Sequence, residues 1–228
     1  MSKTSPKLIL LRHGASLWNE KNIFTGWVDI PLSSKGIEES FQAGKKIAHI
    51  PVDVIYTSTL IRAQMTAMLA MSVHEGDKVP CIVHTEGKLK EWAEIYSEET
   101  KKSCIPVHVA WQLNERMYGE LQGMNKDEMR KKYGADQVHI WRRSFDVAPP
   151  EGESLEETAA RSIPYFQKTI IPVLHQGKNV LISAHGNSLR SIVMFLDKLS
   201  KEQVVNLEMA TGAPMIYTFE AGHFHKDA

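Results

Sequence analysis

Apolar and polar residues alternate along the chain in blocks of two kinds. Short apolar runs predict β-strands over residues 7–11, 52–57, 179–184 and 215–219, with a weaker one at 82–83. Between them, apolar residues recur at three- or four-residue intervals, which predicts helices over residues 34–50, 59–71, 125–133, 136–145, 154–174 and 188–199. Residues 88–104 have no clear pattern. Such alternation predicts an α/β fold with three layers, a mostly parallel sheet between helices on both faces.

Several residues are expected to begin, end or bend these elements. Ser33 or Ser34 is a candidate N-cap for the helix over 34–50, and Pro51 follows as a stop. Pro164 and Pro172 are expected to kink or divide the helix over 154–174. No repeat, low-complexity linker or change in composition marks a boundary, so we expect residues 1–228 to form one domain.

The overall charge balance excludes several classes of protein. The sequence has 27 Lys and Arg against 27 Asp and Glu, and 43% of its residues are hydrophobic. Disordered chains have fewer apolar residues and more net charge, and nucleic-acid binders normally have a basic excess. No run approaches the roughly 20 apolar residues of a membrane span. We therefore expect neither a nucleic-acid nor a membrane partner.

The N-terminus and the cysteines point to a cytoplasmic protein. Residues 1–6 are not followed by a hydrophobic region of signal-peptide length. Cys81 and Cys104 could pair, but they have neither metal-ligand spacing nor a redox motif. We expect two reduced thiols in the cytoplasm.

The candidate chemistry lies where predicted strands end. Two strands run into His-Gly, at His13 and His185, and a third is followed by Arg62. Ligands of open α/β sheets bind at the carboxyl ends of the strands, so Arg12 and these three residues could meet in one crevice. Arginine binds phosphate in a bidentate manner, and no third metal ligand lies near the histidines. This pattern favours phosphate chemistry, with no metal.

A competing interpretation is that either histidine is structural, because a lone histidine after a strand is more often structural than catalytic. The repeated strand–His-Gly context favours a functional role for His13 and His185. We assign no function to the remaining histidines.

Several longer motifs resemble the cofactor-dependent phosphoglycerate mutases of the histidine phosphatase superfamily. The resemblance runs from about residue 7 to residue 219, and Arg-His-Gly alone is typical only of the superfamily. Trp141-Arg-Arg143 and Glu115-Arg-Met-Tyr-Gly119 indicate the mutase branch. Further matching segments are Leu11-Arg-His-Gly-Ala-Ser-Leu-Trp-Asn19, Phe24-Thr-Gly-Trp-Val-Asp-Ile-Pro-Leu-Ser33, Pro149-Pro-Glu-Gly-Glu-Ser154, Ala184-His-Gly-Asn-Ser-Leu-Arg190 and Thr211-Gly-Ala-Pro214.

The resemblance implies a role for each matching position. His13 would carry the phosphoryl group as phosphohistidine, and Glu115 would exchange a proton with the substrate hydroxyl. Arg12, Arg62 and His185 would surround the transferring phosphoryl group. The groups that would assist or hold the rest of the substrate are Asn19, Thr25, Gly26, Tyr118, Lys126, Arg142, Arg143, Gly186 and Asn187.

The same resemblance implies the reaction. The protein would interconvert 3-phosphoglycerate and 2-phosphoglycerate in glycolysis and gluconeogenesis, primed by 2,3-bisphosphoglycerate and without a metal. Its partners would be small phosphoglycerates, and a homo-oligomer is left open. One alternative is a phosphatase or bisphosphoglycerate synthase that uses the same phosphohistidine. Another is a catalytically silent binding protein, against which the intact set of His13, Arg62, Glu115 and His185 argues.

The sequence departs from the family pattern at several places. Ala15 and Met117 stand where the family commonly has more polar residues, which could change the polarity of the site. The spacing between Arg62 and Glu115 is longer than usual, so we expect an atypical insertion around residues 75–109. The family often has a longer C-terminal tail after the position of Phe219, and this tail can lie over the site. We expect the shorter tail of this sequence to cover the site less completely.

Overall fold

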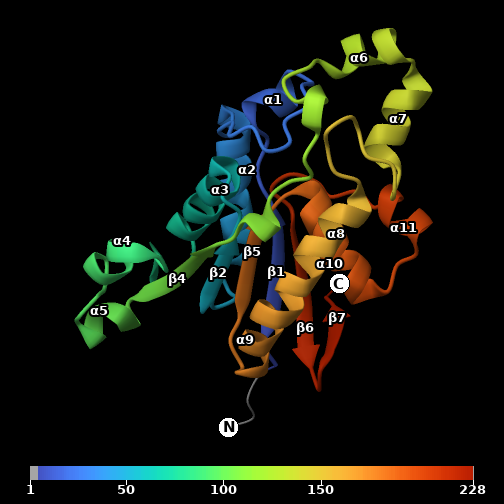
Figure 1. The fold of residues 1–228 in the computed structure, drawn as a ribbon. Helices are drawn as coiled ribbons and strands as arrows, with labels where there is room; N and C mark the ends of the chain where they lie inside the picture. Colours follow the sequence, from blue (N-terminus) through green and yellow to red (C-terminus); the bar gives the residue numbers. More distant parts are fainter. Residues whose placement is uncertain (1–4, 228) are drawn as a thin grey trace.

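A mixed sheet of seven strands occupies the centre of the computed structural model, which describes residues 5–227 (Figure 1). Its strand order is β3-β4-β2-β5-β1-β6-β7, and neighbours from β3 to β1 are parallel. Only the β1–β6 and β6–β7 pairs are antiparallel among the described strands. The expected mostly parallel sheet is therefore confirmed. The strands are β1 (Lys7–Arg12), β2 (Val54–Thr57), β3 (Val79–Ile82), β4 (Cys104–Val109), β5 (Val180–Ala184), β6 (Pro214–Glu220) and β7 (His223–Lys226).

Strand β1 shows why the central strands have continuous apolar sequences. Leu8 and Leu10 pack into the core on one face of the sheet, whereas Ile9 and Leu11 pack into the core on the other. All four side chains are fully buried. A strand covered on both faces needs apolar residues at every position rather than at alternate ones.

Helices cover both faces of the sheet, as the sequence predicts. Helices α2 (Ser34–Ile47) and α3 (Ile61–Ser72) lie on one side, and α8 (Leu155–Tyr165), α9 (Ile171–His175) and α10 (Gly186–Asp197) lie on the other (Figure 1). The Ser33 hydroxyl accepts a hydrogen bond from the Gly36 amide and caps α2. Shorter helices are α1 (Leu17–Glu20) and α11 (Lys201–Asn206).

The helix predicted over residues 154–174 is divided into three pieces. A π-helical segment, Phe166–Ile170, separates α8 from α9. Pro164 lies inside α8 two residues before the π-helical segment, and Pro172 lies in the first turn of α9. A proline amide cannot donate a hydrogen bond, so it fits best where a helix begins.

The segment around residues 75–109, expected to be an atypical insertion, contains β3, two short helices and β4. Helices α4 (Gly87–Trp92) and α5 (Glu98–Lys102) project beyond the β3–β4 edge of the sheet (Figure 1). The end of the segment forms β4, which pairs with β2 inside the sheet and which the sequence pattern did not predict. Cys81 and Cys104 lie on β3 and β4 with their sulfur atoms 2.8 Å apart, and both are free thiols.

A small cap of helices α6 (Lys126–Tyr133) and α7 (Ala135–Arg143) lies above the sheet (Figure 1). The 3₁₀ turns Trp111–Leu113 and Gly119–Leu121 lead into it. Gly134 separates the two helices and adopts a φ of +88°, a conformation that favours glycine. The cap has its own apolar cluster, made of Phe24, Leu121, Met129, Val138 and Trp141.

Among the described residues, no helix is both long and apolar enough to cross a membrane.

Candidate active site

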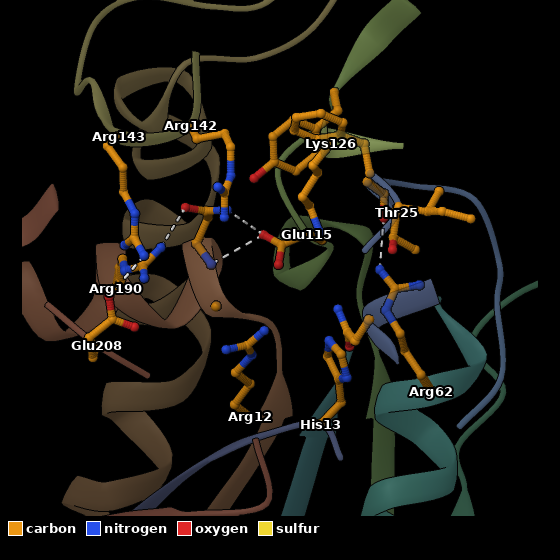
Figure 2. Close-up of a pocket in the computed structure, with 17 residues that line it drawn as sticks. Arg12, His13, Thr25, Arg62, Glu115, Lys126, Arg142, Arg143, Arg190 and Glu208 are labelled. Carbon is orange, nitrogen blue, oxygen red and sulfur yellow. Dashed lines mark hydrogen bonds and ion pairs between the residues drawn. The ribbon is translucent and has the colours of Figure 1, made fainter. Parts of the chain in front are cut away.

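A cavity of about 290 Å³ lies between the strand ends and the cap, where the sequence predicts the site. Figure 2 shows Arg12 and His13 on its floor, Arg142 and Arg143 on the opposite side and Glu115 between them. Every residue predicted for the site except His185 lines the cavity: Arg12, His13, Asn19, Thr25, Gly26, Arg62, Glu115, Tyr118, Lys126, Arg142, Arg143, Gly186 and Asn187. It is also lined by Ile23, Phe24, Arg190 and Glu208.

His13 has one ring nitrogen available for a covalent bond. Its backbone amide donates to the Ala184 carbonyl at 2.9 Å, which fixes the residue at the end of β1. Ring atom Nδ1 lies 2.6 Å from the Gly14 carbonyl, which can only accept, so Nδ1 carries the proton. Burial, followed by the charges of Arg62 and Arg12, holds the pKa of His13 well below its usual value. Nε2 is therefore unprotonated, with a lone pair that could act as a nucleophile.

His185 is not among the residues that line the cavity, but it lies next to His13. The side chain is fully buried, and its ring centroid is 5.0 Å from that of His13. Its Nε2 shares a 2.7 Å hydrogen bond with the Ser58 hydroxyl, a partner that the sequence did not identify. Burial and then the charge of Arg62 hold the pKa of His185 well below its usual value. His185 is thus a neutral, buried ring packed beside His13.

Two arginines beside His13 are fixed before any ligand binds. Arg62 donates from Nη2 to the Gly26 carbonyl at 2.7 Å and from Nη1 to the Val28 carbonyl at 3.0 Å. Burial lowers the pKa of Arg62 to about 10, although the nearby Glu115 carboxylate opposes the change. Arg12 donates from Nη1 to the Met209 carbonyl. These rigid cations suit an oxyanion at His13.

Glu115 has one occupied and one available carboxylate oxygen. Oε1 accepts three N–H bonds, from the Arg116 amide at 2.8 Å, the Asn187 amide at 3.1 Å and Asn187 Nδ2 at 2.9 Å. Oε2 has no hydrogen bond from a described residue. Burial would raise the pKa of Glu115, but the Arg116 amide and the Arg12 charge outweigh it and lower that pKa. An ionised Oε2 can therefore accept a proton.

The far side of the cavity forms a second cationic group. The pKa values of Lys126 and Arg142 are lowered by burial first, and the Arg142 charge further lowers that of Lys126. Arg143 donates to Glu208 Oε1 at 2.8 Å. Arg190 donates to Asn187 Oδ1 at 3.1 Å, and burial lowers its pKa to about 10. Crowded, partly desolvated cations of this kind favour a multiply charged anion.

Arg190 and Glu208 were not predicted as site residues. Arg190 follows Gly186 by four positions on α10, so helical spacing places both on one face, and this signal was present in the sequence. Glu208 lies outside the motifs discussed above, and it is identified by the structure alone, through its place in the cavity lining and its ion pair with Arg143.

The cavity lining includes polar atoms that lack a hydrogen-bond partner in the protein. Among residues 5–227, Arg12 Nε and Thr25 Oγ1 are buried without a hydrogen-bond partner. Six lining side chains are cationic and two are carboxylates. An anion with several oxygen acceptors would complete these bonds and offset the excess charge. In the described part of the chain, no group of three or more His, Cys, Asp or Glu side chains could hold a metal ion.

Comparisons with known proteins agree with this chemistry. The model of the histidine phosphatase superfamily (branch 1) matches residues 8–94 and 89–228. A 2,3-bisphosphoglycerate-dependent phosphoglycerate mutase of Protochlamydia amoebophila is 67% identical over 221 residues, 96% of this chain and 98% of that protein. A mutase of the same name from Chlamydia pneumoniae is 56% identical, covering 93% of each chain. The solved structure of Bacillus stearothermophilus YhfR has a TM-score of 0.75 at 26% identity, covering 97% of this chain and 95% of its own.

Proposed function

Because the chain belongs to the 2,3-bisphosphoglycerate-dependent phosphoglycerate mutases of the histidine phosphatase superfamily, we propose that it interconverts 3-phosphoglycerate and 2-phosphoglycerate. The observation that carries the proposal is the presence, in one cationic cavity, of an unprotonated His13 Nε2 and an unoccupied Glu115 Oε2. The reaction belongs to glycolysis and gluconeogenesis, and we place it in the cytoplasm. The names of the relatives do not favour the phosphatase or synthase alternative.

The cavity fits 2,3-bisphosphoglycerate, which supplies the phosphoryl group that primes His13. This molecule has two phosphates and a carboxylate. Arg12 and Arg62 would hold one phosphate beside His13, where the buried Arg12 Nε and Thr25 Oγ1 have no other partner among the described residues. The other two anionic groups would be held by Tyr118, Lys126, Arg142, Arg143 and Arg190.

In each transfer, Nε2 of His13 carries the phosphoryl group and Oε2 of Glu115 exchanges the proton. As the phosphoryl group moves to the substrate hydroxyl, the P–Nε2 bond breaks and a P–O bond forms. The hydroxyl proton passes to Glu115 Oε2, so charge does not build up on oxygen. In the return step, the other phosphoryl group bonds to Nε2, and Glu115 gives its proton to the oxygen that is released.

The remaining residues stabilise charge and hold geometry. Phosphoryl transfer depends mainly on alignment and on neutralisation of the transferring oxygens, and the guanidinium groups of Arg12 and Arg62 are positioned for this role. The Gly14 carbonyl keeps the His13 ring in the reactive tautomer. Asn19, Gly26, Gly186 and Asn187 complete the wall around the substrate, and the neighbouring His185 ring packs against that of His13.

The function is tested by measuring product in two separate stages. Protein treated with a chelator is incubated with 3-phosphoglycerate, with or without 2,3-bisphosphoglycerate, and the mixture is quenched. Enolase with its own Mg²⁺ then measures the 2-phosphoglycerate formed. We expect product formation that is stimulated by the bisphosphate and unaffected by the chelator. Turnover that requires a divalent metal and ignores the bisphosphate would refute the proposal, and phosphate release in place of isomerisation would favour the phosphatase.

A further inference from the structure

A largely buried ion pair outside the cavity holds the segment that carries Glu115. Glu153 precedes α8 and Arg161 lies within it, and the two side chains meet as a fork. Arg161 Nε donates to Glu153 Oε1 at 2.9 Å, and Nη2 donates to Oε2 at 2.8 Å. Only 8% of the Arg161 side chain and 21% of the Glu153 side chain are exposed. A bidentate, largely buried pair of this kind holds both partners in a defined geometry.

The guanidinium of Arg161 also binds the backbone up to Glu115. Nη1 donates to the carbonyls of Gln112 at 2.9 Å and Asn114 at 3.0 Å. Nη2 donates to the carbonyl of Glu115 itself at 3.0 Å, and the Trp27 indole donates to the same oxygen. One side chain therefore fixes the carbonyl of Glu115 and of the residue before it.

The carboxylate of Glu153 binds the backbone just after Glu115. Its Oε2 accepts from the Met117 amide at 3.0 Å, and the Glu153 amide donates to the Met117 carbonyl at 2.8 Å. Burial would raise the pKa of Glu153, but its bonds from Arg161 and the Met117 amide lower that pKa. Glu153 is therefore ionised and keeps both bonds at neutral pH.

The position of the Glu115 carboxylate depends on this stretch of backbone. Oε1 is held by the amide of Arg116, which lies between the carbonyl bound by Arg161 and the amide bound by Glu153. A shift of the Arg116 amide would move Oε1 and rotate Oε2 away from the substrate oxygen. Misplacement by about 1 Å in an active site can reduce the rate by about a hundredfold.

We infer that Arg161 and Glu153 are positioning residues for proton transfer, which hold the backbone around Glu115 so that Oε2 faces the reacting oxygen. This inference rests on the proposed function, because it assigns the pair a part in that reaction. Neither side chain lines the cavity, so their effect on the substrate is exerted through Glu115.

The inference is tested by a double-mutant cycle on mutase turnover. Glu153→Gln keeps the shape of the side chain but weakens the fork, and is measured alone and together with Glu115→Gln. We expect Glu153→Gln to lower kcat by about tenfold or more in the wild-type background, with little change in KM for 3-phosphoglycerate. In the Glu115→Gln background, the same change should lower kcat by less than about twofold, because the group being positioned is already lost.

Two further variants complete the design. Glu156→Gln is the matched control, because it removes a carboxylate from the start of α8 whose pairing with Lys201 is exposed. We expect it to leave kcat unchanged in both backgrounds. Arg161→Lys keeps the charge but cannot form the fork, so it repeats the test if Glu153→Gln does not fold.

Four outcomes separate the hypotheses. Loss confined to the background with an intact Glu115 supports positioning. Equal fold-losses in both backgrounds would show a structural role independent of Glu115, and no loss would show no role, so either result overturns the inference. Absence of mutase turnover in the wild type would instead contradict the proposed function itself.

Discussion

Replacing Glu115 by Gln removes the group that exchanges the proton and preserves most of its surroundings. The three N–H donors at Oε1 can only be matched by the amide oxygen of Gln, so its NH₂ group must occupy the position of Oε2. That NH₂ group cannot accept the hydroxyl proton. Folding should be little affected, and we expect the free energy of unfolding to change by no more than about 2 kcal/mol.

The rate is expected to fall much more than the stability. General acid–base catalysis is worth about 10²- to 10⁴-fold, which corresponds to about 3 to 5 kcal/mol of barrier. We therefore expect kcat for mutase turnover to fall by that factor while KM changes little. Glu120→Gln serves as the control, because this exposed carboxylate on the same segment does not line the cavity. A Glu115→Gln protein that folds and keeps more than about a tenth of wild-type kcat would refute the assigned role.

Three other predictions concern pH, packing and substrate affinity. His13 and His185 stay neutral in the fold but are protonated in the unfolded chain below about pH 6.5, so the free energy of unfolding should fall as pH drops below that value, by up to about 1.4 kcal/mol per pH unit for each histidine. When the free energy of unfolding is measured by urea titration at several pH values, its decrease with falling pH should be smaller in His13→Gln than in the wild type. An equal decrease in both proteins would contradict the lowered pKa of His13. Phe166→Ala should reduce the free energy of unfolding by about 3–5 kcal/mol, whereas Tyr96→Ala at an exposed site should change it by less than about 0.5 kcal/mol; equal effects in denaturant titrations would argue against the packing described. Glu208→Gln removes a negative charge paired with Arg143, so KM for 3-phosphoglycerate should fall by about two- to fivefold, and this decrease should be smaller at high salt. A rise in KM would show instead that Glu208 assists binding.

The sequence predicts best the parts of the fold with uniform burial. Strands β1 and β5 are covered on both faces and contain continuous apolar runs, Leu8–Leu11 and Val180–Ile182, so the sequence pattern identifies them clearly. Strand β4 was missed because only Ile105 and Val107 point into the core, while Pro106 and His108 are partly exposed and interrupt the apolar pattern. Its place in the sheet depends on pairing with β2, a contact between distant segments.

In the site, too, local sequence patterns identify some residues, whereas others are brought together only by the fold. Arg12 and His13 follow directly from a strand end, and the family motifs supply most of the other lining residues. The pairs Arg143–Glu208 and Arg161–Glu153 were missed because their partners lie 65 and 8 residues apart, at spacings that no local pattern connects. Ion pairs of this kind become visible only when the fold brings the two side chains together.

The most direct test of the mechanism is the position of the phosphoryl group on the protein. Protein incubated with labelled 2,3-bisphosphoglycerate is digested, and the phosphorylated atom is identified by mass spectrometry and by phosphorus NMR. Because Nδ1 of His13 donates to the Gly14 carbonyl, the label is expected on Nε2 of His13 and should be absent from His13→Ala. Label on Nδ1 or on another residue, or a protein that turns over substrate without becoming labelled, would contradict the account.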